Sequence, residues 1–312
     1  MLAVTQDALG GPEVLKVTEV DRPVPGPTEV LVRVEAAGVN PTDWKSRARG
    51  GFLGEPPFTL GYDVSGVVVD SGIGQALYEP GDEVFGMLRY PYGNGAYAQY
   101  VAAPSRHFAR KPSQVDHVHA AAVPLAGLTA WQALVDVAGL RGGQRVLVHA
   151  AAGGVGHLAV QIAKARGAYV IGTASAGKHE FLRGLGADEL VDYRTTDFAE
   201  VVRDVDVVLD GIGGEYGLRS LRTLRRGGTL VTLPLSELDE RLHAEAAERG
   251  VRSAAMLVEP DHAAMRSLAA LMEAGRLRPE VSAVLPLAEA AKAHELGETG
   301  RTTGKIVLTV PH

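Results

Sequence analysis

A glycine-rich turn follows an apolar run in the stretch RVLVHAAAGGVG, residues 145–156. Apolar residues then recur at helical spacing: Leu158, Ala159, Ile162 and Ala163. The pattern predicts a strand, a tight turn and a helix, whose N-terminal N–H groups favour an anion such as the pyrophosphate of a dinucleotide. Gly153 and Gly156 match the second and third glycines of G-x-G-x-x-G, whereas Ala151 replaces the first, so the turn must tolerate a Cβ there.

The turn supplies the residues that we expect to contact the dinucleotide: Ala152, Gly153, Gly154 and Val155. An ordinary strand-to-helix turn is the alternative for a motif with one glycine missing. The strand–helix rhythm that continues after this turn favours the dinucleotide.

The next predicted strand ends at residues 173–175, where an NAD-selective fold would place an Asp or Glu on the ribose 2′-OH. No acid stands there. Ser175 and Lys178 follow, and a hydroxyl beside an ammonium suits a 2′-phosphate, which an Asp would repel. We therefore predict NADPH as the cofactor. The alternative is that Lys178 is a solvated residue in the first turn of the next helix.

Length and composition indicate a two-domain globular protein. The chain has 312 residues, of which 46% are hydrophobic, 22% are charged and 38 are glycine. The net charge of −6, without a basic block, argues against nucleic acid as the main partner. The chain has no cysteine, which excludes disulfides, thiolate zinc sites and cysteine nucleophiles.

Nothing near Met1 resembles a basic-then-apolar export signal, and no uninterrupted apolar run approaches the membrane-spanning length of about 20 residues. We expect a cytoplasmic protein without membrane contact.

The first third of the chain has short β segments punctuated by Gly and Pro, which predicts a small β barrel. Strands are expected at 29–39, 64–69 and 96–103, with a helical turn at 41–49. Residues 116–138 change to helical spacing and are interpreted as a bridge between domains.

Repeated strand–helix units follow the bridge and predict a doubly wound parallel sheet, an α/β fold. Its strands are expected at 145–149, 169–174, 189–192, 205–210, 229–233 and 251–258. The tail predicts helices at 262–274 and 287–296 and a strand at 305–310, which we expect to return to the first domain.

With these motifs in order, the chain resembles the zinc-free quinone oxidoreductase branch, zeta-crystallin-like proteins included, of the medium-chain dehydrogenase/reductase superfamily. The resemblance rests on AAGVNPTD at 36–43, GYDVSGVV at 61–68, GDEVFG at 81–86, AAVPLAGLTA at 121–130 and AAGGVG at 151–156. It implies a GroES-like barrel domain at 1–115, joined by residues 262–312, and a Rossmann domain at 116–261. The active site would lie in the cleft between them.

By this resemblance, zinc-dependent relatives would have Cys at Asn40, His at Tyr62 and a further Cys near Leu125. None of these ligands is present, so we predict no metal site. Quinones and enones suit a metal-free site, because hydride arrives at carbon while charge accumulates on an oxygen that hydrogen-bond donors can stabilise.

The sequence therefore predicts an NADPH-dependent oxidoreductase that reduces a quinone or an α,β-unsaturated carbonyl compound without zinc. The predicted catalytic residues are Asn40 and Tyr62, as donors near the acceptor oxygen or the nicotinamide ribose, and Tyr62 is also a candidate proton donor. The alternative is that both residues only fill the emptied metal site. Lys45, Tyr90 and Tyr92 are weaker candidates.

The resemblance also implies further cofactor contacts. Thr129 would meet the nicotinamide or its phosphate, although a Thr at a helix start is also an ordinary cap. Tyr193 would pack against the adenosine phosphate, unless it is a simple surface tyrosine. Backbone groups of Leu233, Met256 and Leu257 would line the nicotinamide. Near the C-terminus, either Arg301 or Lys305 approaches the phosphate or both belong to a solvated turn.

A rival interpretation is a crystallin-like protein that binds NADPH but has a structural or RNA-binding role, and the acidic balance argues against the RNA version. Similar proteins pair through the last strand of the nucleotide domain, here near 251–258, so we expect a homodimer.

Overall fold

The computed structural model describes residues 1–92, 95–234 and 240–312. Two compact units emerge: Met1–Leu128 with Glu259–His312, and Thr129–Val258. We call them the barrel unit and the nucleotide unit. The unit boundaries therefore lie 13 residues beyond the expected position after residue 115 and three residues before the expected position at 261. None of the helices in the described part of the chain is long and apolar enough to cross a membrane.

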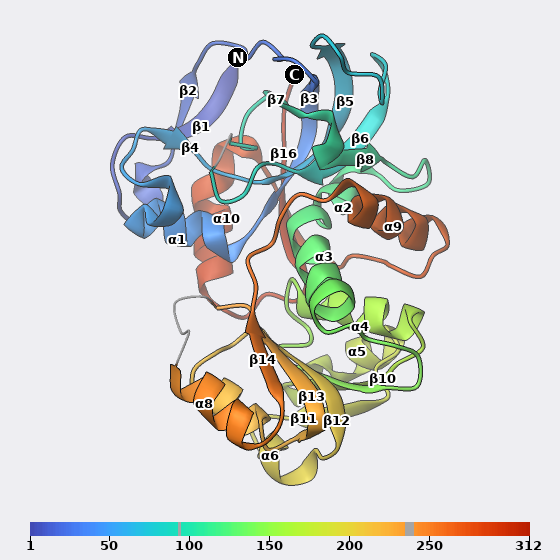
Figure 1. The fold of residues 1–312 in the computed structure, drawn as a ribbon. Helices are drawn as coiled ribbons and strands as arrows, with labels where there is room; N and C mark the ends of the chain where they lie inside the picture. The colour runs from blue at the N-terminus through green and yellow to red at the C-terminus, as the bar shows by residue number, and fades with distance from the viewer. Residues whose placement is uncertain (93–94, 235–239) are drawn as a thin grey trace. The chain divides into compact units, whose positions relative to one another are not determined.

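The barrel unit is built on two sheets (Figure 1). Its strands are β1 (Leu2–Gln6), β2 (Lys16–Glu19), β3 (Glu29–Val39), β4 (Phe58–Thr59), β5 (Asp63–Ser71), β6 (Glu83–Met87), β7 (Tyr100–Pro104), β8 (Phe108–Arg110), β15 (Val281–Pro286) and β16 (Lys305–Thr309). The larger sheet has the order β15-β16-β3-β5-β6-β8, with β7 also paired to β3, and the smaller has the order β2-β1-β4.

Strand β3 organises the larger sheet because it pairs antiparallel with β5, β7 and β16. Val30, Val32 and Val34 alternate along it and are buried in the core with Val64 and Ile306. The last strand of the chain thus completes the sheet that the first third begins.

Helices of the barrel unit are α1 (Pro41–Arg49), α2 (His117–Ala121), α9 (His262–Glu273), α10 (Ala290–Glu298) and the first part of α3 (Pro124–Trp131). Pro41 opens α1 at a position where a missing N–H costs nothing, and Gly50 ends it at a φ of 73°. Helix α10 contacts both α1 and β16.

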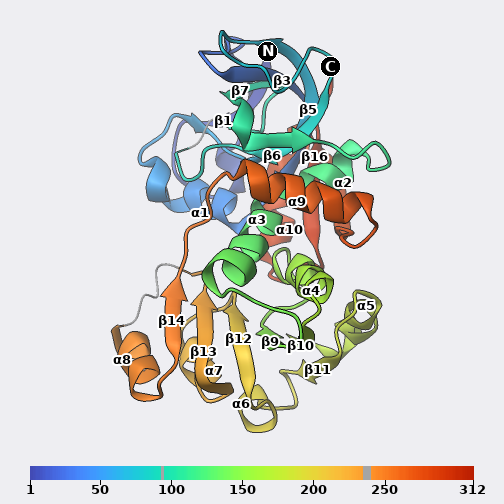
Figure 2. The ribbon, with the colours of Figure 1, turned by 45° about the vertical axis from the view of Figure 1, so that its right-hand side comes forward.

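The nucleotide unit has one parallel sheet in the order β11-β10-β9-β12-β13-β14, three of whose strands lie side by side in Figure 2. Its strands are β9 (Arg145–Val148), β10 (Tyr169–Ala174), β11 (Glu189–Asp192), β12 (Val205–Asp210), β13 (Leu224–Thr232) and β14 (Arg252–Ala255). Its helices are α4 (Gly156–Ala165), α5 (His179–Gly184), α6 (Phe198–Val201), α7 (Glu215–Ser220), α8 (Glu240–Glu248) and a π-helical stretch at Gln132–Val137. This strand order is that of dinucleotide-binding folds and confirms the predicted doubly wound sheet.

The glycine-rich turn joins β9 to α4 as predicted. Its one residue with a left-handed backbone is Ala150, at a φ of 48°. The residue that needs this conformation is therefore Ala150 and not Ala151, which replaces the first glycine of the motif. A Cβ on Gly156 would lie 2.3 Å from the Ala150 carbonyl oxygen, which explains why glycine opens α4. The Gly153 N–H donates to that same carbonyl at 2.8 Å and closes the turn.

His149, at the end of β9, locks the turn to neighbouring elements. Its Nδ1 lies 3.0 Å from Thr173 Oγ1 and its Nε2 lies 2.8 Å from Ser220 Oγ. Burial lowers the pKa of His149 to about 3, so the imidazole is neutral and packs edge-on against Phe198.

One local expectation was wrong, and one strand was missed. Strand β7 begins only at Tyr100, because the N–H groups of Ala96 and Tyr97 bond to the Gly61 and Leu60 carbonyls in a less regular segment. Strand β15 was not expected, and it pairs parallel with β16 at the sheet edge.

Candidate active site

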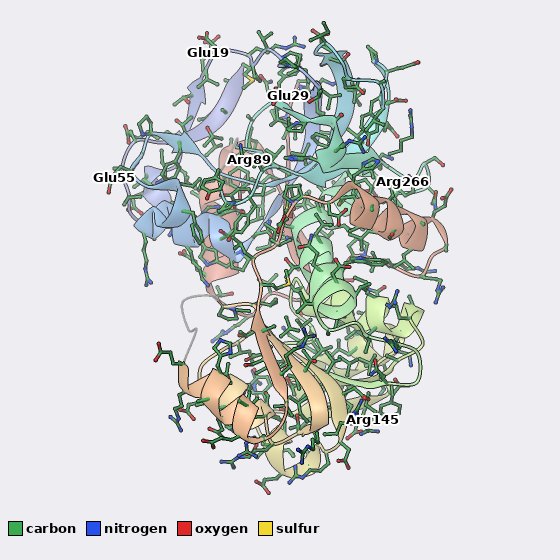
Figure 3. All side chains as sticks on the ribbon, in the orientation of Figure 1. Glu19, Glu29, Glu55, Arg89, Arg145 and Arg266 are labelled. Carbon is green, nitrogen blue, oxygen red and sulfur yellow. The ribbon has the colours of Figure 1, made fainter. Side chains whose placement is uncertain are left out.

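Four polar side chains are buried together in the barrel unit. Asn40, Asp43, Asp63 and Lys305 have exposed fractions of 2%, 0%, 0% and 3%. Charged side chains elsewhere, such as Glu19, Glu55 and Arg266, lie exposed on the surface (Figure 3). Burying charges in this way is costly unless each finds partners, so we call these four residues the buried polar cluster and account for their bonds.

Strand pairing assembles the cluster. Asn40 follows the end of β3, where Gly38 is the register partner of Asp63 on β5 and Val39 that of Ile306 on β16. The first residues of β5 and β16 therefore flank the last residue of β3.

Asp63 is the acceptor that the other members share. Its Oδ2 accepts from Asn40 Nδ2 at 2.8 Å and from Lys305 Nζ at 3.2 Å. Its Oδ1 accepts from the Leu125 N–H at 2.6 Å. Lys305 Nζ also donates to Asn40 Oδ1, so the ammonium is held by one carboxylate and one amide.

Asp43 caps α1 from inside the helix. Its Oδ2 accepts from the Asn40 N–H at 2.7 Å and from the Tyr97 hydroxyl at 3.1 Å. Its Oδ1 has no hydrogen-bond partner among the described residues. Burial, aided by the nearby charge of Asp63, raises the pKa of Asp43 to about 7 although Lys305 acts in the opposite direction. Asp43 therefore changes its protonation state near neutral pH.

A hydrogen-bonded chain runs from Asp43 towards α10. The Tyr97 hydroxyl lies 3.2 Å from His294 Nε2, and His294 Nδ1 lies 3.3 Å from Arg47 Nη1. Burial lowers the pKa of His294 to about 3, so the ring is neutral and accepts from Arg47 at Nδ1. Arg47 pairs with Glu298 at 2.7 Å.

Tyr62 belongs to a different set of contacts. Its hydroxyl donates to the Pro91 carbonyl at 3.1 Å, and its ring packs edge-on against Tyr90 with centroids 5.0 Å apart. Burial raises the pKa of Tyr62 well above its usual value, so the hydroxyl stays protonated. The structure thus brings Asn40, but not the Tyr62 hydroxyl, into the buried polar cluster.

Sequence reasoning missed Asp43 and Asp63 and left Lys305 open between a phosphate contact and a solvated turn. Lys305 is neither exposed in a solvated turn nor available at the surface for a phosphate, because it is buried on Asp63. Arg301 is exposed. A signal for Asp43 was present, since Asn at the helix start with Asp three residues later is a capping pattern. Asp63 and Lys305 are single charged residues at the starts of β5 and β16, and no local sequence pattern marks either of them.

In the part of the chain that the structure describes, no group of three or more His, Asp or Glu side chains could hold a metal ion. The ammonium of Lys305 donates to Asn40, and position 40 is where zinc-dependent relatives would have a Cys ligand.

Most of the predicted cofactor residues follow the ends of strands in the nucleotide unit. Thr129 is on α3, with an exposed fraction of 7%. Ala152, Gly153, Gly154 and Val155 form the turn between β9 and α4. Leu233 follows β13, and Met256 and Leu257 follow β14. The carboxyl edge of a parallel sheet is where such folds bind nucleotides, and the absence of a Cβ at Gly156 permits the tight turn. These residues fit a dinucleotide.

Ser175 and Tyr193 each follow the last residue of neighbouring strands, since Ala174 and Asp192 are register partners at the ends of β10 and β11. Lys178 ends the helical turn that Ser175 begins. Asp192, which sequence reasoning missed, accepts from the Ala176 N–H at 3.2 Å and the Arg194 N–H at 2.9 Å. A carboxylate therefore does lie beside the turn that Ser175 begins. It comes from the end of β11 and not from the end of β10, where sequence reasoning looked for it.

Comparisons with known families match two stretches of the chain. Residues 26–113 match the model of the alcohol dehydrogenase GroES-like domain, and residues 185–308 match that of zinc-binding dehydrogenases.

Individual relatives cover nine-tenths of the chain or more. A quinone oxidoreductase from Coxiella burnetii superposes with a TM-score of 0.93 at 37% identity, covering 100% of this chain and 99% of that one. The Escherichia coli quinone oxidoreductase complexed with NADPH has a TM-score of 0.89 at 28% identity, covering 99% and 100%. A 2-methylene-furan-3-one reductase of Solanum lycopersicum is 34% identical, over 90% of this chain and 71% of the reductase.

Asp43 generates a prediction about stability and pH. The pKa of Asp43 is raised from 3.8 to about 7 in the folded protein, so its contribution to stability is fully present below pH 3.8 and is lost as the pH rises through 7. Asp43→Asn keeps an acceptor for Asn40 and Tyr97 but removes the titration. Between pH 5 and pH 8, the wild type should lose about 2–3 kcal/mol of unfolding free energy relative to this variant.

Urea unfolding at several pH values measures the difference. Asp21→Asn, at an exposed carboxyl of the same unit, is the control and should give a constant offset from the wild type. Parallel curves for wild type and Asp43→Asn would show that Asp43 does not titrate in this range.

Proposed function

Because the chain belongs to the medium-chain dehydrogenase/reductase superfamily, among relatives that include quinone oxidoreductases, we propose that this oxidoreductase uses NADPH to reduce a quinone or an α,β-unsaturated carbonyl compound without zinc. The quinone oxidoreductases and the furanone reductase among its relatives support these two acceptor classes.

The observation that carries the proposal is the buried polar cluster. A zinc enzyme polarises an alcohol or carbonyl through its metal, and residue 40 would be a ligand in zinc-dependent relatives. Here Asn40 is an amide, bonded to Lys305 and Asp63. A conjugated acceptor needs no Lewis acid, because hydrogen-bond donors suffice to stabilise the charge that develops on its oxygen.

NADPH would supply the hydride when bound, and the protein orients the partners and stabilises charge. Asn40 and Tyr62 are the donors we propose. Asn40 Nδ2 carries two hydrogens, and the bond to Asp63 uses one. Tyr62 has a single hydroxyl hydrogen, which Pro91 receives, so Tyr62 must exchange that bond before it can donate. Asn40 is accordingly our first choice.

Steady-state oxidation of NADPH with a panel of quinones and enones, with and without prolonged chelation, tests the function. We expect turnover with members of one class and no loss after chelation, since no residue offers a zinc thiolate. Activity that disappears and returns only with zinc would contradict the zinc-free mechanism. Tight NADPH binding without turnover of any acceptor would favour the crystallin-like alternative.

NADPH is preferred over NADH in our proposal because Ser175, Lys178 and Tyr193 gather at the ends of β10 and β11. The hydroxyl and the ammonium suit a 2′-phosphate, whereas Asp192 adds a negative charge whose oxygens already accept backbone N–H groups.

Lys178→Ala should weaken NADPH binding roughly ten- to a hundredfold and leave NADH binding nearly unchanged, since a charge-assisted bond contributes roughly 1.5–3 kcal/mol. Ser175→Asp should shift preference towards NADH by repulsion of the phosphate and a bond to the ribose. Dissociation constants of both cofactors measure this. Arg183→Ala, an exposed cation on α5, is the control and should change neither. Equal weakening of both cofactors by Lys178→Ala would rule out a 2′-phosphate contact.

We also propose a homodimer formed through β14, which is an edge strand of the described nucleotide sheet. An edge strand leaves backbone N–H and C=O groups for pairing with a second copy. Light scattering at micromolar concentration should give twice the mass of the 32.8 kDa chain. A proline at Ala254, in the middle of β14, should shift the mass towards the monomer. A monomeric wild type would contradict the proposal.

A further inference from the structure

Lys305 is a buried lysine at the start of β16, and the function proposed above gives it no role of its own in the reaction. Its exposed fraction is 3%, and its Nζ donates to Asn40 Oδ1 and Asp63 Oδ2. An ammonium buried to this degree is tolerated only with paired charge and hydrogen bonds.

Lys305 and Asp63 together fix which way the Asn40 amide faces. The ammonium donates to Oδ1, and Asp63 Oδ2, which also accepts from Lys305 at 3.2 Å, accepts one Nδ2 hydrogen at 2.8 Å. Rotating the amide by half a turn would set its NH₂ against the ammonium, donor against donor.

The ammonium also changes the chemistry of the amide. A cation on an amide oxygen draws electron density from the nitrogen, and hydrogen bonds in such a chain strengthen one another in a low-dielectric interior. The second Nδ2 hydrogen thereby becomes a stronger donor. The Leu125 N–H holds the other oxygen of Asp63 at 2.6 Å, so the carboxylate that Asn40 and Lys305 share is fixed in place.

We propose that Lys305 is a positioning residue for the reaction: it orients and polarises the Asn40 amide so that the second Nδ2–H stabilises the oxyanion of the reduced acceptor. This inference rests on the proposed function, and it makes Lys305 act through Asn40 without touching the acceptor. Hydride still comes from the cofactor.

A double-mutant cycle tests the proposal. Lys305→Met should lower kcat about tenfold with little change in KM, since a donor that acts in the transition state is weakened. In the Asn40→Ala background the same substitution should change kcat by less than about twofold, because the residue through which it acts is gone. Lys305→Arg should retain most of the activity. Equal effects in both backgrounds would overturn the proposal.

Lys111→Met is the matched control for the loss of a buried lysine. Lys111 has an exposed fraction of 8%, and it pairs with Glu83 at 3.0 Å in the same unit. It should leave kcat unchanged. If Lys305→Met alone fails to fold because Asp63 is left unpaired, the neutral pair Lys305→Met with Asp63→Asn replaces it in the cycle.

A second readout needs no turnover. The two side-chain Nδ2 hydrogens of Asn40, assigned in the free protein by their loss in Asn40→Ala, should give separate NMR signals that shift in Lys305→Met and stay unchanged in Lys111→Met. Unchanged signals in Lys305→Met would overturn the proposal even if the enzyme is active. If the wild type reduces no acceptor, the proposed function fails, and the NMR result still decides whether Lys305 controls the amide.

Discussion

The antiparallel pairing of β16 with β3 is the constraint on which the barrel unit depends. It joins Ile306 to Val39 across most of the length of the chain and continues to Thr309 and Ala36. Strand β3 pairs on its other side with β5, so three strand ends meet where Asn40, Asp63 and Lys305 lie. Without the return of the C-terminal segment, Asp63 would be a buried carboxylate without its cation, a costly state.

One ammonium and two carboxyl groups lie where these strand ends meet, and the two carboxyl groups have different hydrogen-bond partners. Asp63 receives bonds from Lys305, Asn40 and the Leu125 N–H on both of its oxygens. Asp43 receives bonds on one oxygen only, and burial raises its pKa to about 7. Two ionised carboxylates beside one lysine would leave a net buried charge, which a proton on Asp43 removes.

In the nucleotide unit, the predicted cofactor contacts are mainly backbone groups, which lie at one edge of the sheet. The strand order brings the ends of β9, β10 and β11 together. The glycine at the start of α4 allows the turn to approach closely, and neutral His149 ties the end of β9 to Thr173 and Ser220. In the function that we propose, cofactor specificity depends on few side chains at the strand ends, among them Ser175 and Asp192.

Local patterns in the sequence determined the elements and the kind of fold. Alternation along β3, the glycine turn at Gly153 and Gly156 and the repeated strand–helix units each depend on neighbours within a few residues, so periodicity alone predicts them. Asn40 was predicted from the resemblance to a family, and its capping pattern with Asp43 is a local signal that was also present. Tertiary structure alone decided that Lys305 lies on Asn40 and Asp63, that Tyr62 bonds to Pro91, and that Asp192 joins the corner of Ser175. These contacts join residues distant in the chain, and only strand register and burial bring such residues together.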